Sequence, residues 1–238
     1  FGCAIDELPE LLAAADARGL HVKGLSFHVG SQVDGPAAHV DAIRRCLPFL
    51  ETRRPGALAR ATVLDLGGGF PVNYDGATPE IDAFCAPIRE ALDLVPAHVD
   101  VIAEPGRYLA APTMTCVTSV VGRARRGGRM WYYLDDGVYG SFSGQIYDHT
   151  RYPLVALDAR GEPEPSVLAG PTCDSVDVIA EELPLGELRI GDLIVAPMMG
   201  AYTAASASEF NSLPRTRILA LGAPQRLTAA DDRVVRLA

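Results

Sequence analysis

The sequence lacks the features that mark membrane proteins and nucleic-acid-binding proteins. Its 238 residues contain no apolar run long enough to cross a bilayer, and no signal peptide opens the chain. Positive charge is scarce, because 21 Lys and Arg stand against 30 Asp and Glu, for a formal net charge of -9. This acidic balance argues against nucleic acid as a partner and is compatible with a cationic substrate. We therefore expect a protein that binds neither membranes nor nucleic acid.

Paired cysteines and metal-binding motifs are also missing. The five cysteines are odd in number and include no C-x-x-C spacing, so we expect no disulfide framework and a reducing compartment, the cytoplasm. The five histidines form no H-E-x-x-H or other paired spacing, and we expect no metal site. The chain opens on Phe1 without an initiator Met, which we interpret as the start of an interior segment of a longer polypeptide.

The first part of the chain alternates between strand-like and helical segments. Three apolar runs have the pattern of strands, at 22–29, 62–66 and 101–104. Helical periodicity covers about 37–50 and 78–94. An earlier helix is predicted to start at an Asp6 N-cap and to end at Gly19. The even alternation predicts a βαβαβ segment whose last strand is covered on both faces.

After about residue 110 the texture of the sequence changes. Strand-like runs such as 114–121, 131–134 and 193–197 alternate with Gly, Pro and Asp turns, and little helical periodicity is present. We therefore predict two domains, an α/β domain over residues 1–110 and a β-rich, barrel-like domain over residues 111–238.

Polar residues follow each predicted strand of the first domain. His28 and Ser31 come after the first strand, Gly67–Gly69 directly after the second, and Glu104 and Arg107 after the third. In α/β barrels such strand ends carry the chemistry, and glycine-rich loops bind phosphate through backbone N–H groups. Together these residues suit a ligand with a basic ring nitrogen and a phosphate. Each signal also has a purely structural alternative. His28 could be a histidine whose hydrogen bonds are made within the protein, Gly67–Gly69 could form a tight turn, and Glu104 and Arg107 could form an ion pair that closes a surface turn.

The second domain carries further polar clusters in its predicted turns. They lie at 136–142, 147–149, 170–174, 200–203 and 210–211. Cys173 and Asp174 are adjacent in one of these turns, which begins Gly-Pro. The pair is either part of an ordinary loop or a thiol that donates a proton beside a carboxylate that binds an amine.

The motifs of both domains resemble those of one known family. In chain order they are F-H-V-G-S at 27–31, L-D-L-G-G-G-F at 64–70, A-E-P-G-R at 103–107, D-G-V-Y-G at 136–140, G-P-T-C-D at 170–174 and G-A-Y-T at 200–203. With this set the chain resembles the pyridoxal-phosphate-dependent ornithine decarboxylase group over nearly its whole length. The resemblance implies the C-terminal part of an alanine-racemase-like (β/α)8 barrel followed by a β domain, in a homodimer with shared active sites.

The resemblance also implies roles for individual residues. Glu104 would keep the pyridine nitrogen of pyridoxal 5'-phosphate protonated, so that the ring acts as an electron sink, and His28 would stack on the ring face. Cys173, supplied by the partner subunit, would protonate the α-carbon of the substrate. Asp148 and Asp174, one from each subunit, would bind the distal ammonium. The cofactor would also be held by Ser31, Gly67, Gly68, Gly69, Gly106, Arg107 and Tyr202, and the substrate pocket would be lined by Tyr139 and Phe210.

One residue of the family has no counterpart in this sequence. The family binds its cofactor covalently to a lysine well upstream of the H-V-G motif, whereas the only lysine here, Lys23, lies on the outer half of a predicted strand. A complete barrel also takes roughly 200–250 residues. Residues 1–110 hold only three of the expected strands, and we therefore expect the missing lysine to precede Phe1.

The resemblance predicts decarboxylation of ornithine or lysine to a diamine, as in polyamine biosynthesis. A diaminopimelate decarboxylase is the first alternative, but that relative usually has Glu after the catalytic Cys, where this sequence has Asp174. A catalytically silent regulatory paralogue is the second, and the presence of Glu104, Arg107 and Cys173 argues against it. Ornithine and lysine differ by one methylene, worth about 1–3 kcal/mol, and the sequence does not rank them.

Overall fold

The structure, a computed structural model, describes residues 2–50, 62–74, 76, 78 and 80–221, and the backbone of 234–237. Within these residues no helix is both long enough and apolar enough to span a membrane. The chain divides into two compact units, Phe1–Leu109 and Ala110–Ala238. The first is an α/β unit and the second is built mainly of β-strands, which confirms the predicted fold class.

The first unit contains a three-stranded parallel sheet. Its elements are α1 (Leu8–Ala17), β1 (Gly24–Ser26), α2 (Ala37–Leu50), β2 (Val63–Asp65), α3 (Ile81–Leu92), β3 (Asp100–Ile102) and the start of α4 (Gly106–Ala110). The strands pair in the order β1-β2-β3, and the register aligns their last residues, Ser26, Asp65 and Ile102. Because all three strands run parallel, the segments that follow them emerge at one edge of the sheet.

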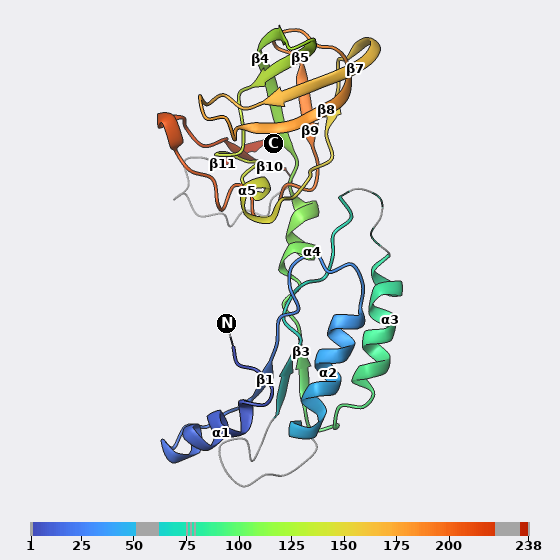
Figure 1. The fold of residues 1–238 in the computed structure, drawn as a ribbon, viewed down its shortest axis with the longest axis vertical. Coiled ribbons are helices and arrows are strands. Elements are labelled where there is room, and N and C mark those ends of the chain that lie inside the picture. Colours follow the sequence, from blue (N-terminus) through green and yellow to red (C-terminus); the bar gives the residue numbers. More distant parts are fainter. Residues whose placement is uncertain are drawn as a thin grey trace. The chain divides into compact units, whose positions relative to one another are not determined.

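Helices α2 and α3 lie side by side against this sheet (Figure 1). Their apolar residues recur at helical spacing and meet Leu64 of β2 in one buried cluster, to which the helices contribute Ile43, Cys46, Leu50, Phe84, Ile88 and Ala91. Burying one such large side chain is worth about 1.5–3 kcal/mol, so the cluster fixes the strands and with them the edge where the motif residues emerge.

Two local predictions for the first unit are wrong, and a third falls partly outside the described residues. The N-cap of α1 is Glu7 rather than Asp6, and it makes no side-chain cap hydrogen bond, because its carboxylate accepts the N–H of Ala4 at 2.8 Å. Strand β3 is exposed rather than covered, with Ile102 50% exposed. In the described sheet β3 is an edge strand, and the buried cluster is centred on β2. Pro79, at the expected start of α3, lies outside the described residues.

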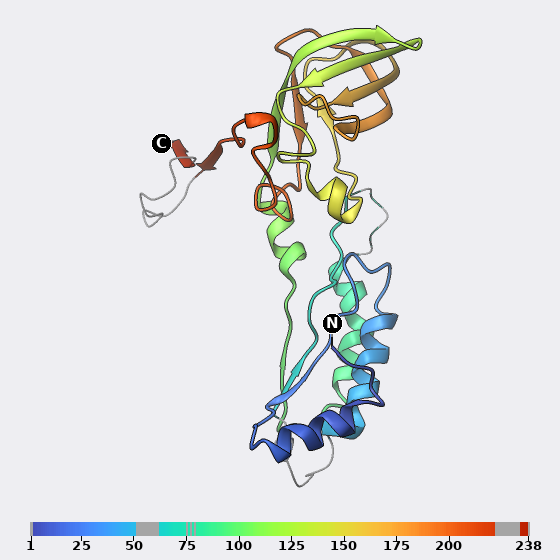
Figure 2. The same cartoon turned by 60° about the vertical axis from the view of Figure 1, so that its left-hand side comes forward.

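A six-stranded sheet in the order β6-β9-β4-β5-β7-β8 organises the second unit (Figure 2). All neighbouring strands are antiparallel except β5 and β7, which run parallel. The elements are η1 (Ala111–Thr113), β4 (Cys116–Arg126), β5 (Arg129–Leu134), α5 (Gly144–Asp148), β6 (Val155–Ala156), β7 (Arg160–Ala169), β8 (Val178–Glu187), β9 (Leu193–Ala196), η2 (Phe210–Ser212), β10 (Ile218–Leu221) and β11 (Val234–Leu237). Strands β10 and β11 form a separate parallel pair.

The parallel pairing of β5 and β7 sets two of the motifs beside each other. Strand β5 follows a hairpin turn in which Gly127 and Gly128 both have positive φ, the geometry of a two-residue turn between twisted strands. Tyr133 near its end pairs with Ala169, the last residue of β7. The D-G-V-Y-G motif and the G-P-T-C-D motif therefore leave the sheet in the same direction from neighbouring strands.

Candidate functional site

The glycine run after β2 lies between the loops that follow β1 and β3. A Cβ atom on Gly67 would lie 2.1 Å from the carbonyl oxygen of Phe27. One on Gly68 would lie 3.0 Å from the carbonyl oxygen of Glu104 and 3.2 Å from Cε1 of His28. Gly67 also has a φ of 60°, in the left-handed region that favours glycine. The three loops approach this closely because these positions carry no side chain.

Two backbone N–H groups of the glycine run already have partners within the protein. Gly67 donates to Oδ1 of Asp65 at 2.9 Å, and Gly68 donates to Nδ1 of His28 at 3.2 Å. Nδ1 accepts in this contact, which assigns the proton of a neutral His28 ring to Nε2. A phosphate that uses the Gly68 N–H requires the His28 ring to turn away. The phosphate-binding role of Gly67 and Gly68 stays a prediction.

The loop after β1 is fastened to the loop after β2 by a residue that the sequence did not single out. The side-chain amide of Gln32 donates to the carbonyl oxygen of Val72 at 2.9 Å and accepts the N–H of Val72 at 2.6 Å. Val33 donates its backbone N–H to the carbonyl oxygen of Gly69 at 3.2 Å. Ser31, which precedes Gln32, is exposed at this edge. Nothing in a lone glutamine predicts such a bidentate bond to the backbone.

The third loop contributes a carboxylate and a guanidinium. Glu104 is exposed, and its backbone is held by the bond from its N–H to the carbonyl oxygen of Gly67 at 2.7 Å. The carbonyl oxygen of Glu104 accepts the N–H of Gly106 at 2.7 Å, which turns the chain into α4. Arg107 is buried, and its Nη1 lies 3.4 Å from the hydroxyl of Tyr74, in the segment after the glycine run. A buried guanidinium and an exposed carboxylate therefore stand three residues apart at this edge.

A buried histidine on α2 forms a hydrogen bond with the backbone of the glycine run. His39 on α2 is fully buried beside Phe70, with ring centroids 5.0 Å apart, and its Nε2 lies 3.0 Å from the carbonyl oxygen of Gly68. Burial lowers the pKa of His39, and so does nearby His28, while the bond to Gly68 opposes this shift. A neutral ring that donates from Nε2 fits these surroundings. The sequence signal was available but unused, since His39 shares the helix face of Ile43.

In the second unit the structure brings together three of the predicted substrate residues. The hydroxyl of Tyr139 donates to Oδ2 of Asp174, and the rings of Tyr139 and Phe210 stack with centroids 4.2 Å apart. The bond to Asp174 raises the pKa of Tyr139 to about 12. The same bond, with the N–H of Val176, holds the pKa of Asp174 below its ordinary value. Asp174 is therefore ionised at neutral pH beside an aromatic pair.

Cys173 is exposed next to this carboxylate, and its sulfur accepts a contact from Nδ2 of Asn211 at 3.5 Å. The two other residues predicted for this unit, Asp148 and Tyr202, lie in other segments of the chain. Asp148 is the exposed last residue of α5, and Tyr202 is exposed with a φ of 54° in the turns after β9. Asn211 was visible in the sequence only as the neighbour of Phe210.

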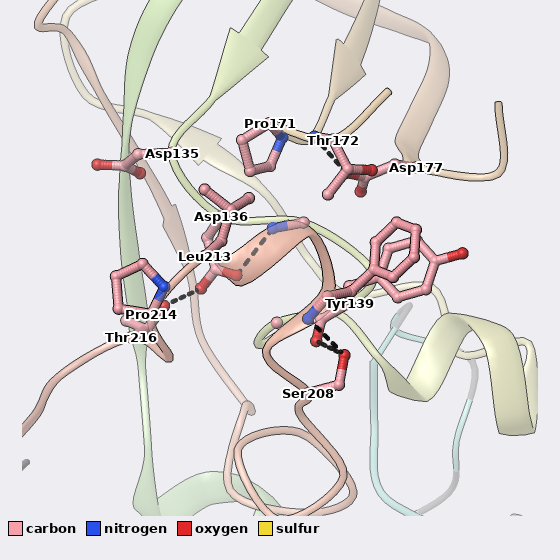
Figure 3. A pocket seen from close by; sticks show the side chains of 13 residues that line it. Asp135, Asp136, Tyr139, Pro171, Thr172, Asp177, Ser208, Leu213, Pro214 and Thr216 are labelled. Carbon is pink, nitrogen blue, oxygen red and sulfur yellow. Dashed lines mark hydrogen bonds between the residues drawn. The ribbon is translucent and has the colours of Figure 1, made fainter. Parts of the chain in front are cut away.

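Buried carboxylates hold the two loops of this group in place around a pocket (Figure 3). Asp177 accepts the N–H of Val138 at 2.9 Å and both the N–H and the hydroxyl of Thr172, and so ties the two motifs together. Asp136 accepts the N–H of Ser141 at 2.9 Å and the hydroxyl of Thr216 at 2.6 Å. Because every such bond satisfies a buried acceptor, these two carboxylates act as structural anchors.

The chain shows similarity to proteins of known activity. A family model described as "Pyridoxal-dependent decarboxylase, C-terminal sheet domain" matches residues 27–200. A lysine/ornithine decarboxylase from Selenomonas ruminantium is 41% identical over 215 residues, 89% of this chain and 53% of that protein. An antizyme inhibitor 2 from Xenopus laevis is 33% identical over 237 residues, 92% of this chain and 51% of that protein.

The chain is also similar to solved structures of decarboxylases. The lysine/ornithine decarboxylase from Vibrio vulnificus, in complex with cadaverine, superposes with a TM-score of 0.88 and 47% sequence identity. The match covers 100% of this chain and 61% of that chain. This chain spans about half the length of the curated relatives it matches.

Proposed function

This chain belongs to the pyridoxal-dependent decarboxylases, and we propose that the protein decarboxylates a basic L-amino acid, lysine or ornithine, to the corresponding diamine. The observation that carries this proposal is the group formed by Cys173, Asp174 and Tyr139, in which an exposed thiol stands beside an ionised carboxylate. A thiol is a suitable proton donor, and an ionised carboxylate is a suitable partner for a distal ammonium group. A diamine product is consistent with polyamine biosynthesis.

The sheet edge of the first unit fits pyridoxal 5'-phosphate. Three loops converge on Gly68, where a side chain would fill the space between His28 and Glu104. The exposed ring of His28 offers a flat face, the carboxylate of Glu104 suits a protonated ring nitrogen, and the guanidinium of Arg107 suits a phosphate. Ser31 and Gly69 complete the proposed cradle, with Gly106 and Tyr202 as further contacts. When bound, the cofactor supplies a ring that withdraws the electron pair released as CO₂ leaves.

The residues of the second unit then handle the substrate. We assign to Asp174 and Asp148 the two sides of the distal ammonium, and Tyr139 keeps Asp174 oriented by its hydrogen bond. Tyr139 and Phe210 form a stacked wall that suits the aliphatic chain of the substrate. Cys173 donates the proton of its thiol to the α-carbon after CO₂ has left, and the electron pair of the S–H bond stays on sulfur.

We also propose a homodimer with shared active sites, in which Cys173 and Asp174 complete the site of the partner subunit. The odd number of cysteines and the lack of a C-x-x-C pair favour a reducing compartment, and we assign the protein to the cytoplasm. The mechanism further needs a lysine at the sheet edge. Lys23 stands at the other end of β1, where its carbonyl oxygen accepts the N–H of Thr62 at 2.8 Å. The proposal therefore requires a lysine from outside these 238 residues.

The test measures CO₂ and diamine from the intact protein supplied with pyridoxal 5'-phosphate. Lysine should yield cadaverine and ornithine should yield putrescine. Glu104→Ala should lower kcat severely while the cofactor remains partly bound, because the carboxylate tunes the ring rather than anchoring it. Near wild-type turnover in this variant would exclude Glu104 as the partner of the ring nitrogen.

The same assay separates the two alternatives. Release of lysine from diaminopimelate, without reaction of lysine or ornithine, would favour a diaminopimelate decarboxylase. Bound cofactor without turnover of any of the three would favour a silent paralogue, a possibility that the similarity to an antizyme inhibitor keeps relevant. Asp174 in place of Glu and the exposed thiol of Cys173 favour the proposed decarboxylation of lysine or ornithine.

A further inference from the structure

We infer that Asn211 is a positioning residue for the Cys173 thiol, whose sulfur it holds through its side-chain amide and whose thiolate it stabilises. Nδ2 of Asn211 lies 3.5 Å from Sγ of Cys173, within the range of an N–H donor on sulfur. The two residues stand 38 positions apart in the sequence, in separate loops. The inference rests on the proposed function, because it concerns the proton donor of that reaction.

The backbone around Asn211 is unfavourable by itself and is held by the surrounding contacts. Asn211 has φ 56° and ψ 22°, and Ser212 after it has φ 57°, so two successive residues with side chains adopt the left-handed conformation. Such conformations persist where neighbouring structure imposes them, and they concentrate at functional sites. Asn tolerates this conformation better than most residues, so the amide is compatible with the turn that aims it at the sulfur.

A chain of contacts fixes this turn on the loop that carries Cys173. The N–H of Ser208 donates to the carbonyl oxygen of Tyr139 at 2.8 Å, and Phe210 stacks on the Tyr139 ring. Tyr139 in turn donates to Asp174, the residue after Cys173. The segment from Ser208 to Phe210 is therefore attached to Tyr139, which is itself hydrogen-bonded to the residue after Cys173, and this connection places the Asn211 amide near the sulfur.

The chemistry of an amide donor suits a thiol that gives up its proton. When the S–H bond breaks, the proton forms the new C–H bond at the α-carbon and the electron pair remains on sulfur. An N–H that donates to a charged acceptor makes a stronger bond than one that donates to a neutral acceptor, so the contact from Asn211 strengthens as negative charge develops on the sulfur. Because the amide donates to a lone pair of the sulfur, the S–H proton is not used in this contact and stays available for transfer.

Two substitutions of Asn211 test this contact through the thiol itself. The rate of alkylation of Cys173 by iodoacetamide is measured against pH in the intact protein, with each cysteine followed separately by mass spectrometry. In Asn211→Ala the alkylation rate of Cys173 at a given pH should fall by about tenfold, as expected for the loss of a hydrogen bond to a charged group. In Asn211→Asp the alkylation rate should fall further, because a negatively charged acceptor of the same shape replaces the donor. Cys3, which is exposed in the first unit, serves as the internal reference and should not change.

Ser212→Ala is the matched control, since it alters the next residue of the same turn and leaves the amide in place. Its Cys173 profile should match that of the wild type. Asp has the same tolerance for left-handed backbone as Asn, so Asn211→Asp retains the turn even where Asn211→Ala distorts it. An unchanged Cys173 profile in Asn211→Asp overturns the inference.

The kinetic readout separates positioning from substrate binding. Both Asn211 variants should lower kcat by about tenfold, roughly the effect of losing one hydrogen bond to a charged group, while KM for lysine changes little because Asp174 is intact. A rise in KM with unchanged kcat would contradict the assignment. The alkylation profile does not depend on turnover, so a protein without decarboxylase activity refutes the proposed function and still reports on the Asn211–Cys173 contact.

Discussion

At the scale of single residues, the pair formed by Tyr139 and Asp174 sets the charge of the second-unit site. Asp174 accepts from the Tyr139 hydroxyl and from the N–H of Val176, and both bonds favour its ionised form. Tyr139 remains protonated because its pKa is raised to about 12. The phenol therefore stays a donor throughout the physiological range, and Asp174 stays an acceptor whose two oxygens each accept one bond and have further lone pairs.

The first prediction concerns the contact between Asp174 and the substrate ammonium. Deleting a charged hydrogen bond costs about 1.5–3 kcal/mol. Asp174→Ala should therefore lower kcat/KM for lysine and ornithine by roughly 10- to 150-fold in steady-state assays. The kcat/KM for 2-aminohexanoic acid, which has the length of lysine but no distal amine, should fall much less.

The matched control for this substitution is Asp158→Ala, which removes an exposed carboxylate between β6 and β7. It should leave kcat/KM unchanged for both kinds of substrate. Equal losses in Asp174→Ala for the charged and the uncharged substrate would indicate general damage and defeat the assignment.

The second prediction concerns the buried ring of His39. Its pKa is lowered in the folded protein, so below the ordinary value of 6.5 the unfolded chain binds a proton that the folded chain does not. Stability must then fall as the pH falls through this range. Between pH 7 and pH 5, the free energy of unfolding measured with denaturant should fall more in the wild type than in His39→Gln. The difference between the two decreases should be at most about 2 kcal/mol.

Glutamine at position 39 can still donate to the carbonyl oxygen of Gly68 but does not titrate, which makes it the appropriate reference. Parallel pH profiles for the two proteins would show that His39 contributes nothing to acid sensitivity. A profile that is flatter in the wild type than in the variant would reverse the assigned sign.

At the scale of elements, the glycine run after β2 joins three strand ends into one surface. Cβ atoms on Gly67 and Gly68 would collide with the loops after β1 and β3, and His39 on α2 bonds to the carbonyl oxygen of Gly68. The run therefore connects the strand ends to the buried core through one backbone carbonyl. A change at these glycines acts on all three loops together.

The third prediction compares two glycines that both have positive φ. A Cβ on Gly67 would meet the carbonyl oxygen of Phe27 at 2.1 Å, whereas one on Gly76 would meet nothing within 4 Å. Gly67→Ala should therefore reduce the free energy of unfolding by about 1–3 kcal/mol more than Gly76→Ala, the usual cost of overpacking. Chemical denaturation of both variants gives the comparison, and cofactor affinity should fall in Gly67→Ala alone. Equal decreases in the free energy of unfolding in the two variants would show that the positive φ alone, and not the contact with Phe27, accounts for the effect.

At the scale of the whole molecule, the chain comprises two units that carry different parts of the proposed chemistry. The cofactor-binding candidates His28, Glu104 and Arg107 belong to the first unit, and the substrate-binding candidates Cys173 and Asp174 belong to the second. In the proposed homodimer, the first unit of one subunit works with the second unit of its partner. This arrangement has a consequence that mixing experiments detect.

The fourth prediction is complementation between two inactive proteins. Exchange of subunits between a Cys173→Ala homodimer and a Glu104→Ala homodimer should restore activity, because one of the two sites in each heterodimer then carries neither substitution. Random pairing limits the recovery to about a quarter of the wild-type rate, since half of the dimers are mixed. Subunit exchange demonstrated by mass spectrometry, without recovery of activity, would show that each site uses residues of one chain only.

Much of this organisation was predictable from the sequence, because it depends on neighbours along the chain. Hydrophobic periodicity predicted the α/β alternation and the helix over 37–50, which the structure has as α2. Glycine and proline marked the strand ends, and the motif residues were found by their position after predicted strands. The N-cap of α1 was missed because Glu7, one residue later, starts the helix without a side-chain bond.

By itself, the sequence determined the fold class, the family and the residues proposed for the chemistry, since each of these rests on local patterns of residue type. Only the tertiary structure decided which of these residues touch and what supports them. Gln32 holds Val72 across 40 positions, and Asn211 reaches Cys173 across 38. His39 bonds to Gly68 across 29 positions and is packed against the rings of Phe27, Phe70 and Phe84. Such contacts depend on how distant segments pack together, and no local preference of the chain specifies them.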